Sequence, residues 1–284
     1  MGKIALAAKI THVPSMYLSE MPGKNYGCRQ SAIDGHKEIS RRCRELGVDT
    51  IIVFDTHWLV NSGYHINCNA EYEGIYTSNE LPHFIKDMEY RYEGNPALGH
   101  LIAEKARDKG VRAMSHEIPS LEMEYGTLVP MRYMNDDNQF KVLSISAFCT
   151  SHDLENSRKL GEALVEAIKE YDGTVAVLAS GSLSHRFIWD TKAEEGMDSY
   201  TREFDRQVDL RVVDMWQKGL WADFVKMLPE YAEYCFGEGM MHDTAMLLGV
   251  MGWDKYEGKA EIITELFASS GTGQINAVLP FDQK

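Results

Sequence analysis

Short apolar segments alternate along this chain with longer segments whose apolar residues recur at helical spacing. This alternation constrains the fold most, because strands separated by helices of such length form a sheet with helices on its faces. The predicted strands cover Ile4–Ile10, Thr50–Asp55, Tyr64–Asn67, Val111–Met114, Lys141–Ser146, Thr174–Ser180 and Ile262–Leu266. The predicted helices cover Ser31–Leu46, Pro96–Lys109, Asp153–Tyr171, Ser199–Lys218 and Met240–Met251. We therefore expect an α/β fold: one catalytic domain over residues 1–284, a central largely parallel or mixed sheet flanked by helices, and a helical C-terminal third.

The balance of charges argues against one broad class of partner. Asp and Glu total 43 against 29 Lys and Arg, which gives a formal net charge of −14. Nucleic acids are bound by clustered cations, so we expect no nucleic-acid partner. No apolar stretch approaches the roughly 18 residues that span a bilayer, and the N-terminal apolar run is interrupted by Lys9. The 5 cysteines are widely spaced and form no CxxC pair, which is typical of reduced thiols, so we expect a cytoplasmic protein without membrane association.

Three histidines stand directly after predicted strands. His12 follows the first strand, His57 follows the second, and His185 follows the strand Thr174–Ser180. In open α/β sheets ligands bind where strands end, so these positions are the informative ones. Imidazole is the commonest metal ligand in proteins, and two imidazoles with one carboxylate form the facial set of non-haem iron(II) sites. A single histidine at a strand end is usually structural, but a pair at equivalent ends of consecutive strands makes a metal site at His12 and His57 as good an interpretation as a structural role, and the residues alone leave both open.

The third ligand of such a set is a carboxylate from elsewhere in the chain. Glu238 is the best candidate, because Gly237 and Gly239 on either side allow unusual backbone angles and close approach. A glutamate at the start of a helix is also a common cap or dipole partner, so this alternative stays open. His242 stands four positions after Glu238 and is a weaker candidate for a ligand on the same helical face.

His185 is the candidate acid/base. The small polar residues Ser180 to Ser184 before it let the backbone approach a ligand, and an imidazole near neutral pKa suits proton transfer. The alternative, in which His185 is a metal ligand and His57 is structural, also fits the sequence. Arg132 and Arg186 are possible partners for a substrate carboxylate, and each is equally a possible member of a structural ion pair.

With these residues in place, the chain resembles the class III extradiol ring-cleaving dioxygenases over nearly its whole length. Four segments in order carry the resemblance: the early strand with His12, Asp55-Thr56-His57-Trp58, Gly181-Ser182-Leu183-Ser184-His185 and Gly237-Glu238-Gly239. The resemblance implies that His12, His57 and Glu238 hold Fe(II), with Mn or Mg possible at the same site, and that His185 is the acid/base. One departure is Tyr125, which stands where a second active-site histidine is often found; a phenol donates a hydrogen bond but is a weak base near pH 7.

The resemblance also implies the activity and the partners. Within the family the chain most resembles members that cleave 3,4-dihydroxyphenylacetate with O2 to 5-carboxymethyl-2-hydroxymuconate semialdehyde, in the catabolism of aromatic compounds. The expected partners are therefore a catechol and O2, and we further expect a homo-oligomer. Two other functions stay open at this point: a Memo-like, non-enzymatic binding protein of the same fold, and a metal-dependent hydrolase.

Overall fold

An eight-stranded mixed sheet forms the centre of the molecule, for which we describe residues 2–188 and 192–281 of a computed structural model. Its strands, in the spatial order β6-β3-β7-β2-β8-β1-β10-β9, are Ala113–His116, Tyr64–Asn67, Lys141–Cys149, Thr50–Val60, Thr174–Ser180, Lys3–Ile10, Thr272–Val278 and Glu261–Ser269. The central strands β7, β2, β8 and β1 run parallel, whereas β10 and β9 are antiparallel additions beside β1. The predicted α/β class with a central mixed sheet is confirmed.

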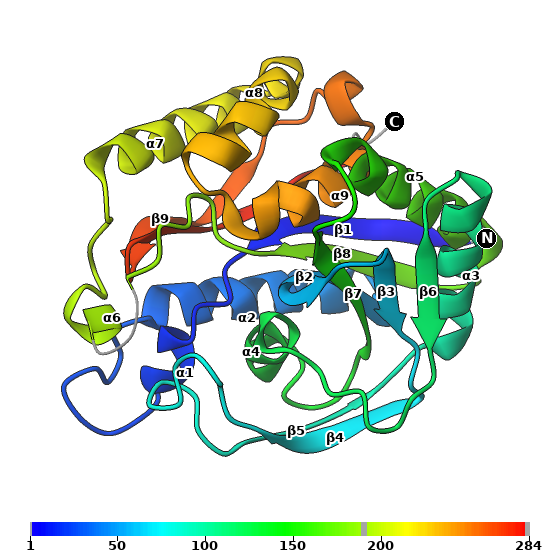
Figure 1. Cartoon of the computed structure of the whole chain (residues 1–284). Helices are drawn as coiled ribbons and strands as arrows, with labels where there is room; N and C mark the ends of the chain where they lie inside the picture. The colour runs from blue at the N-terminus through cyan, green and yellow to red at the C-terminus, as the bar shows by residue number, and fades with distance from the viewer. Residues whose placement is uncertain (1, 189–191, 282–284) are drawn as a thin grey trace.

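Helices cover both faces of this sheet (Figure 1). On one face α5 (Leu154–Glu170) packs against α3 (Pro96–Asp108) and α9 (His242–Met251), and α9 also contacts β8 and β2. On the other face α2 (Gln30–Glu45) and α4 (Tyr125–Met134) pack against each other and against the sheet. Because both faces are covered, β2 from residue 50 to 56 and β8 from residue 175 to 180 are buried, and both consist of nearly continuous apolar residues.

The helical C-terminal third is also confirmed. It is built from α7 (Glu203–Lys218) and α8 (Trp221–Tyr234), the short 3₁₀ segment η1 (Glu238–Met241), and α9. Smaller elements complete the described chain: α1 (Ser15–Leu18), α6 (Lys192–Glu195), η2 (Trp253–Lys255) and a separate hairpin of β4 (Glu71–Tyr76) and β5 (Met88–Glu93).

Several elements differ from the sequence prediction. The β4–β5 hairpin was not predicted, because charged residues alternate along both strands and leave little apolar signal. The helices α4 and α8 were missed because each contains a proline, Pro130 and Pro229, which usually ends a helix. The prediction of a strand at Val111–Met114 was displaced by two residues from the observed β6.

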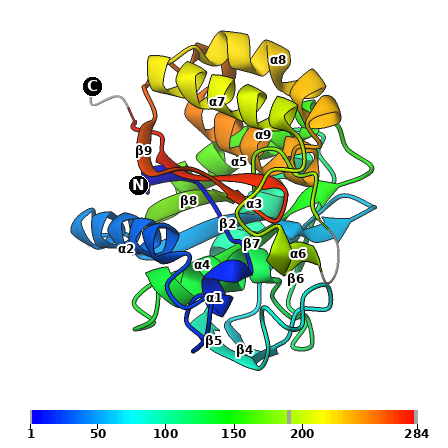
Figure 2. The ribbon, with the colours of Figure 1, turned by 90° about the vertical axis from the view of Figure 1, so that its left-hand side faces the viewer.

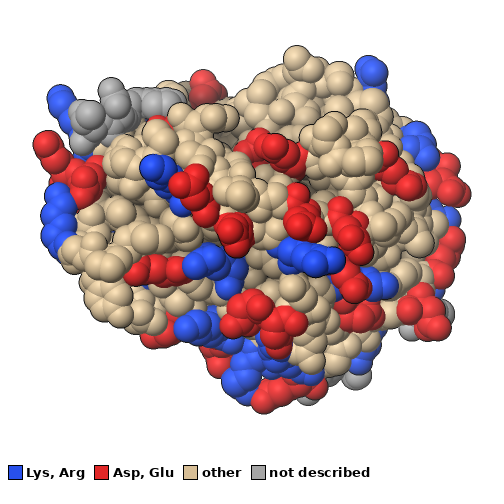
Figure 3. Space-filling model, turned by 90° about the horizontal axis from the view of Figure 1, so that it is seen from below, with Lys and Arg blue, Asp and Glu red and all other residues tan. Residues whose placement is uncertain are grey.

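Figure 3 shows one face of the molecule, on which charged residues of both signs are exposed. There, Lys and Arg are interspersed with Asp and Glu, and the basic groups form no continuous patch. No helix among the described residues is long and apolar enough to cross a bilayer.

The carboxyl ends of the parallel strands lie at one edge of the sheet, which faces the viewer in Figure 2. The segments after β1 and β8 leave the sheet at this edge, and the pairing of β2 with β8 ends there at Asp55 and Ser180. All of the predicted ligand-bearing segments that follow strands therefore converge on the same edge.

Candidate metal centre

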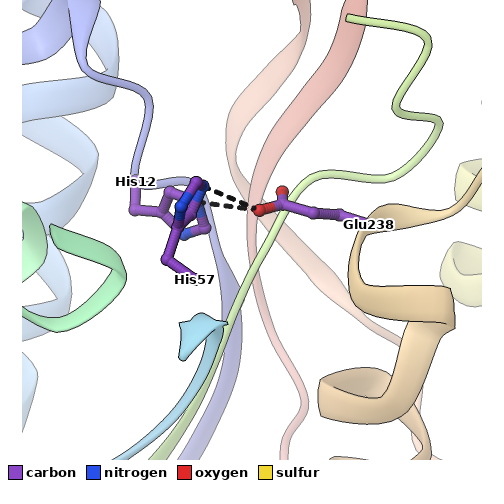
Figure 4. A group of neighbouring side chains, drawn as sticks. All are labelled: His12, His57 and Glu238. Atoms are coloured by element: carbon purple, nitrogen blue, oxygen red, sulfur yellow. Dashed lines mark ion pairs between the residues drawn. The ribbon is translucent and has the colours of Figure 1, made fainter. Parts of the chain in front are cut away.

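Three predicted ligands meet at this edge of the sheet. His12 lies two residues beyond β1, and His57 lies in the last part of β2, after the pairing with β8 has stopped at Asp55 and Ser180. Glu238 begins η1 and approaches from the opposite side, so that its carboxylate points toward both imidazoles (Figure 4). His57 was expected just after its strand; β2 instead continues to Val60, because it resumes pairing with β7 at Leu59.

The three side chains form a compact donor set. The Glu238 Oε1 atom lies 3.0 Å from His12 Nε2 and 3.4 Å from His57 Nε2, and one ligand atom from each residue lies within 4.8 Å of the others. His12 and Glu238 are 3% and 5% exposed. Two imidazole nitrogens and one carboxylate oxygen, converging in a largely water-excluded place, fit a divalent transition metal and leave other coordination positions for substrates.

A hydrogen-bond chain fixes the orientation of the His12 ring. The Ser180 hydroxyl donates to the carbonyl oxygen of Gly126, and the same Oγ lies 2.9 Å from His12 Nδ1. Since its one proton is used toward Gly126, Ser180 Oγ accepts the proton of His12 Nδ1. The lone pair of His12 is therefore on Nε2, the nitrogen that faces Glu238 and is needed for a metal.

The Glu238 carboxylate is held by donors on both oxygens. Thr56 Oγ1 lies 2.7 Å from Oε1, and the backbone N–H of Ser182 donates to Oε2. Burial by itself raises the pKa of Glu238. In the acid range where this carboxyl titrates, however, the protonated imidazoles of His12 and His185, together with the hydrogen bond from His12, outweigh burial and hold that pKa well below its usual range. In the metal-free protein this side chain is thus a carboxylate, the form that binds a cation.

The backbone around Glu238 is strained. Gly239, Met240 and Met241 all have positive φ angles, of 54°, 55° and 63°, and Phe236 before them has a φ of 52°. Non-glycine residues in the left-handed region cost about 1–2 kcal/mol each. Such strain persists where surrounding contacts over-determine the conformation and is concentrated at functional sites, so it supports a functional role for Glu238.

His185 lines the same small cavity as His12 and His57, two of the three candidate ligands. The backbone before it is anchored by Asp209 of α7, which accepts hydrogen bonds from the N–H and the hydroxyl of Ser184, and the His185 N–H donates to the carbonyl of Cys235. Burial lowers the pKa of His185, and the charge of Glu238 opposes this effect only in part. The imidazole is therefore neutral at pH 7 and available as a base.

Tyr125, the first residue of α4, packs against His57 with ring centroids 3.7 Å apart. Its hydroxyl donates to Glu80 Oε2 at 3.3 Å, and burial first, together with the Glu80 charge, raises the pKa of Tyr125 well above its usual value. Burial by itself lowers the pKa of His57, but the hydrogen bond to Glu238 outweighs it and raises that pKa. Tyr125 is thus a hydrogen-bond donor at this site rather than a base.

Three other candidates lie elsewhere. His242 accepts or donates a hydrogen bond at Nδ1 with Ser157 and takes no part in the three-residue set. Arg132 forms a bidentate ion pair with Glu20, and Arg186 pairs with Asp205. Of the two roles considered for each arginine, a partner of the substrate carboxylate or a member of a structural ion pair, the structure shows the ion pair.

The residues that hold the ligands were not identified from the sequence. Thr56 is adjacent to His57, and Ser180 and Ser182 belong to the small polar run before His185, which was attributed only to backbone approach. Nothing in the sequence indicated that Ser180 contacts His12, because the two residues come from strands whose pairing is known only in the folded sheet.

Comparison with known proteins decides the family. A family model described as the catalytic LigB subunit of aromatic ring-opening dioxygenase matches residues 6–280. The chain belongs to this LigB family. The resemblance to ring-cleaving dioxygenases that the sequence predicted is therefore confirmed, and membership in a family of catalytic subunits favours an enzyme over the binding-protein alternative.

Individual relatives agree with the LigB assignment. The chain is 75% identical over 259 residues to a 3,4-dihydroxyphenylacetate 2,3-dioxygenase of Escherichia coli, covering 91% of this chain and 94% of the relative. It is 24% identical to a 2-aminophenol 1,6-dioxygenase beta subunit of a Pseudomonas species, covering 84% and 82%. A solved structure of an uncharacterized protein from Escherichia coli K12 matches with a TM-score of 0.63 at 14% identity, over 97% of this chain and 100% of that one, which shows the shared fold alone.

Proposed function

We propose that this protein is a metal-dependent extradiol dioxygenase that opens 3,4-dihydroxyphenylacetate with O2 between C2 and C3, giving 5-carboxymethyl-2-hydroxymuconate semialdehyde. The observation that carries the proposal is the convergence of His12, His57 and Glu238 at the carboxyl edge of the sheet, in a LigB-family chain. The substrate follows from the 75% identity to the Escherichia coli enzyme of that name, which extends over nine-tenths of the chain.

The metal in this proposal is Fe(II), held by His12 Nε2, His57 Nε2 and one oxygen of Glu238. A metal held by these residues would bind a catechol and would supply the redox route that dioxygen chemistry needs. Mn or Mg suits the same nitrogen and oxygen donors, since affinity alone selects poorly among divalent metals. Bringing both reactants to one place removes much of the entropic cost of their meeting.

The remaining side chains handle protons and orientation. The neutral imidazole of His185, in the same cavity as His12 and His57, accepts a proton from a substrate hydroxyl and returns it at a later step. Tyr125 presents its ring to His57 and keeps its proton, because its pKa lies far above neutrality. It therefore shapes the cavity and orients His57.

Besides the site histidines and Tyr125, the cavity is lined by the acidic residue Glu80 and by a group of neutral polar residues: Ser15, Ser182, Ser269, Ser270, Thr272 and Gln274. We place the substrate carboxylate against this neutral group, away from Glu80. The sequence led us to expect cations here, but no lysine or arginine is among the described residues that line the cavity. We propose that hydroxyl and amide donors bind the carboxylate.

Anaerobic loading with Fe(II), followed by oxygen-uptake assays, tests the function. The values of kcat/KM are compared for 3,4-dihydroxyphenylacetate, protocatechuate and unsubstituted catechol, and the ring-opened product is identified by mass spectrometry and NMR. We expect a clear preference for the first compound and cleavage beside the hydroxyl pair. Equal efficiency on all three contradicts the substrate assignment, cleavage between the hydroxyl carbons contradicts the extradiol assignment, and ester or amide hydrolysis without oxygen uptake indicates the hydrolase alternative.

Assembly and location belong to the same proposal. We propose a homo-oligomer acting in the cytoplasm, and analytical ultracentrifugation tests the first of these. All of the cysteines are free thiols and four of them are buried, as expected for a reducing compartment.

A further inference from the structure

A fully buried ion pair lies beneath the candidate metal centre. Lys9 of β1 donates from Nζ to the carboxylate of Asp243 in the first turn of α9, and the two side chains are 1% and 0% exposed. Lys9 is the residue that interrupts the first apolar strand of the sequence. Buried ion pairs are frequently no more stabilising than apolar side chains of the same volume, so stability alone does not account for this one.

The ion pair contacts the backbone that holds two of the ligands. A Cβ atom placed on Gly181 would lie 2.9 Å from Asp243 Oδ2 and 3.1 Å from Lys9 Nζ, so this glycine rests directly on both charged groups. Gly181 is flanked by Ser180, which accepts from His12, and by Ser182, whose N–H donates to Glu238. The ion pair therefore packs against the backbone segment that makes both hydrogen bonds, the one with His12 and the one with Glu238.

The same ion pair also fixes the far end of the strained turn. Glu238 precedes the left-handed residues Gly239 to Met241, and Asp243 follows them at the start of α9. Before the turn, the Glu238 N–H donates to the carbonyl of Leu183. Lys9 on β1 thereby links the strand that leads to His12 with the segment that carries Glu238.

From these contacts we propose that Lys9 and Asp243 are positioning residues for metal binding: their ion pair holds Gly181 and the start of α9 so that His12 and Glu238 converge on one ion. This inference rests on the proposed metal role of His12, His57 and Glu238. Outer contacts of this kind typically change metal affinity by 10- to 100-fold.

Two single variants separate positioning from charge. Lys9→Met leaves Asp243 without its partner, as a neutral or negative group near the site, whereas Asp243→Asn leaves the positive charge of Lys9. If only charge acted, the two changes would move the affinity for a cation in opposite directions, or the first would leave it unchanged. Positioning predicts that both variants bind the metal more weakly, by roughly 10- to 100-fold.

A double variant, Lys9→Met/Asp243→Leu, removes both charges and leaves none unpaired in the interior, which keeps the test valid if a single variant does not fold. We expect its metal-free form to melt near the wild-type Tm while its metal affinity falls as in the single variants. The matched control is Arg132→Met/Glu20→Leu, which removes a partly buried ion pair away from the candidate ligands and leaves metal affinity unchanged.

The measurements are anaerobic Fe(II) titration against a chromophoric chelator and Mn(II) binding by electron paramagnetic resonance, each with the thermal melt of the metal-free protein. Wild-type affinity in a folded double variant, or opposite shifts in the single variants, overturns the positioning role. A Glu238→Ala protein is titrated alongside. If it binds metal as the wild type does, the proposed metal site fails, and that result is distinguishable from failure of the Lys9–Asp243 inference alone.

Discussion

Replacing Ser180 with alanine tests whether the orientation of His12 is set by a single hydroxyl. In the wild type this hydroxyl accepts from His12 Nδ1 and donates to the Gly126 carbonyl, and Ser180 is 0% exposed. The variant leaves a buried ring N–H without a partner, at a cost of about 1–3 kcal/mol. It also frees the ring to place its proton on Nε2, which would remove the lone pair that faces Glu238. We expect the affinity for Fe(II) to fall by roughly 10- to 100-fold.

Ser182→Ala is the matched control for this experiment. Ser182 lies two residues later, just beyond the end of β8, and is also buried, but it contacts Glu238 through its backbone N–H, which alanine retains. Its hydroxyl instead accepts from the Gln274 side chain. Anaerobic titration of both variants against a chelator should show weakened binding for Ser180→Ala alone. Equal affinity in the two variants, whether both weakened or both unchanged, would refute the role assigned to the hydroxyl.

Three further predictions follow from the site and the core. Glu238→Ala should lose most bound metal while the metal-free protein keeps its Tm; retained stoichiometric iron with normal turnover contradicts the ligand assignment. His185→Gln should keep metal and catechol binding but slow turnover by roughly 10²- to 10⁴-fold, whereas loss of iron would make His185 a ligand. Burial lowers the pKa of His36 and of His242 from 6.5 to about 4. Each neutral histidine therefore contributes about 3 kcal/mol to the free energy of unfolding, which is fully present above pH 6.5 and is lost as the pH falls toward 4. Denaturant titrations at several pH values should show that the free energy of unfolding of His36→Gln falls less steeply over this range than that of the wild type. An equally steep fall in the two proteins contradicts the prediction.

The centre of the fold could be predicted from the sequence because its strands are buried on both faces. Thr174–Ser180 was predicted with the bounds that the structure shows, since its apolar run is continuous, and Tyr64–Asn67 was predicted with the observed bounds from residues that alternate between apolar and polar. The β4–β5 hairpin could not be predicted in the same way, because it lies outside the main sheet and keeps charged residues on one side of each strand.

Part of the candidate site could likewise be predicted from the sequence, and part of it could not. His12 and His57 could be found because strand ends converge by topology, which the order of elements already implies. The conformation that aims Glu238 could not be found, since Met240 and Met241 carry no signal for left-handed backbone, and only the packing around η1 selects it. The contacts from Ser180 and Thr56 depend on which strands are neighbours, a property of the sheet order rather than of local sequence.

The position of β1 between β8 and β10 has a consequence for synthesis of the chain. At roughly 5–20 residues per second, His12 emerges from the ribosome about 10 to 50 s before Glu238. Until β8 (Thr174–Ser180) emerges, β1 is an apolar strand with both edges unpaired, and the edge that β10 covers stays unpaired until after Glu238 has been made. An unpaired apolar edge is a template for aggregation. The same delay means that the three-residue set can assemble only after Glu238 has been made, so the proposed metal enters a chain in which the strands β1 to β8 have already been synthesised.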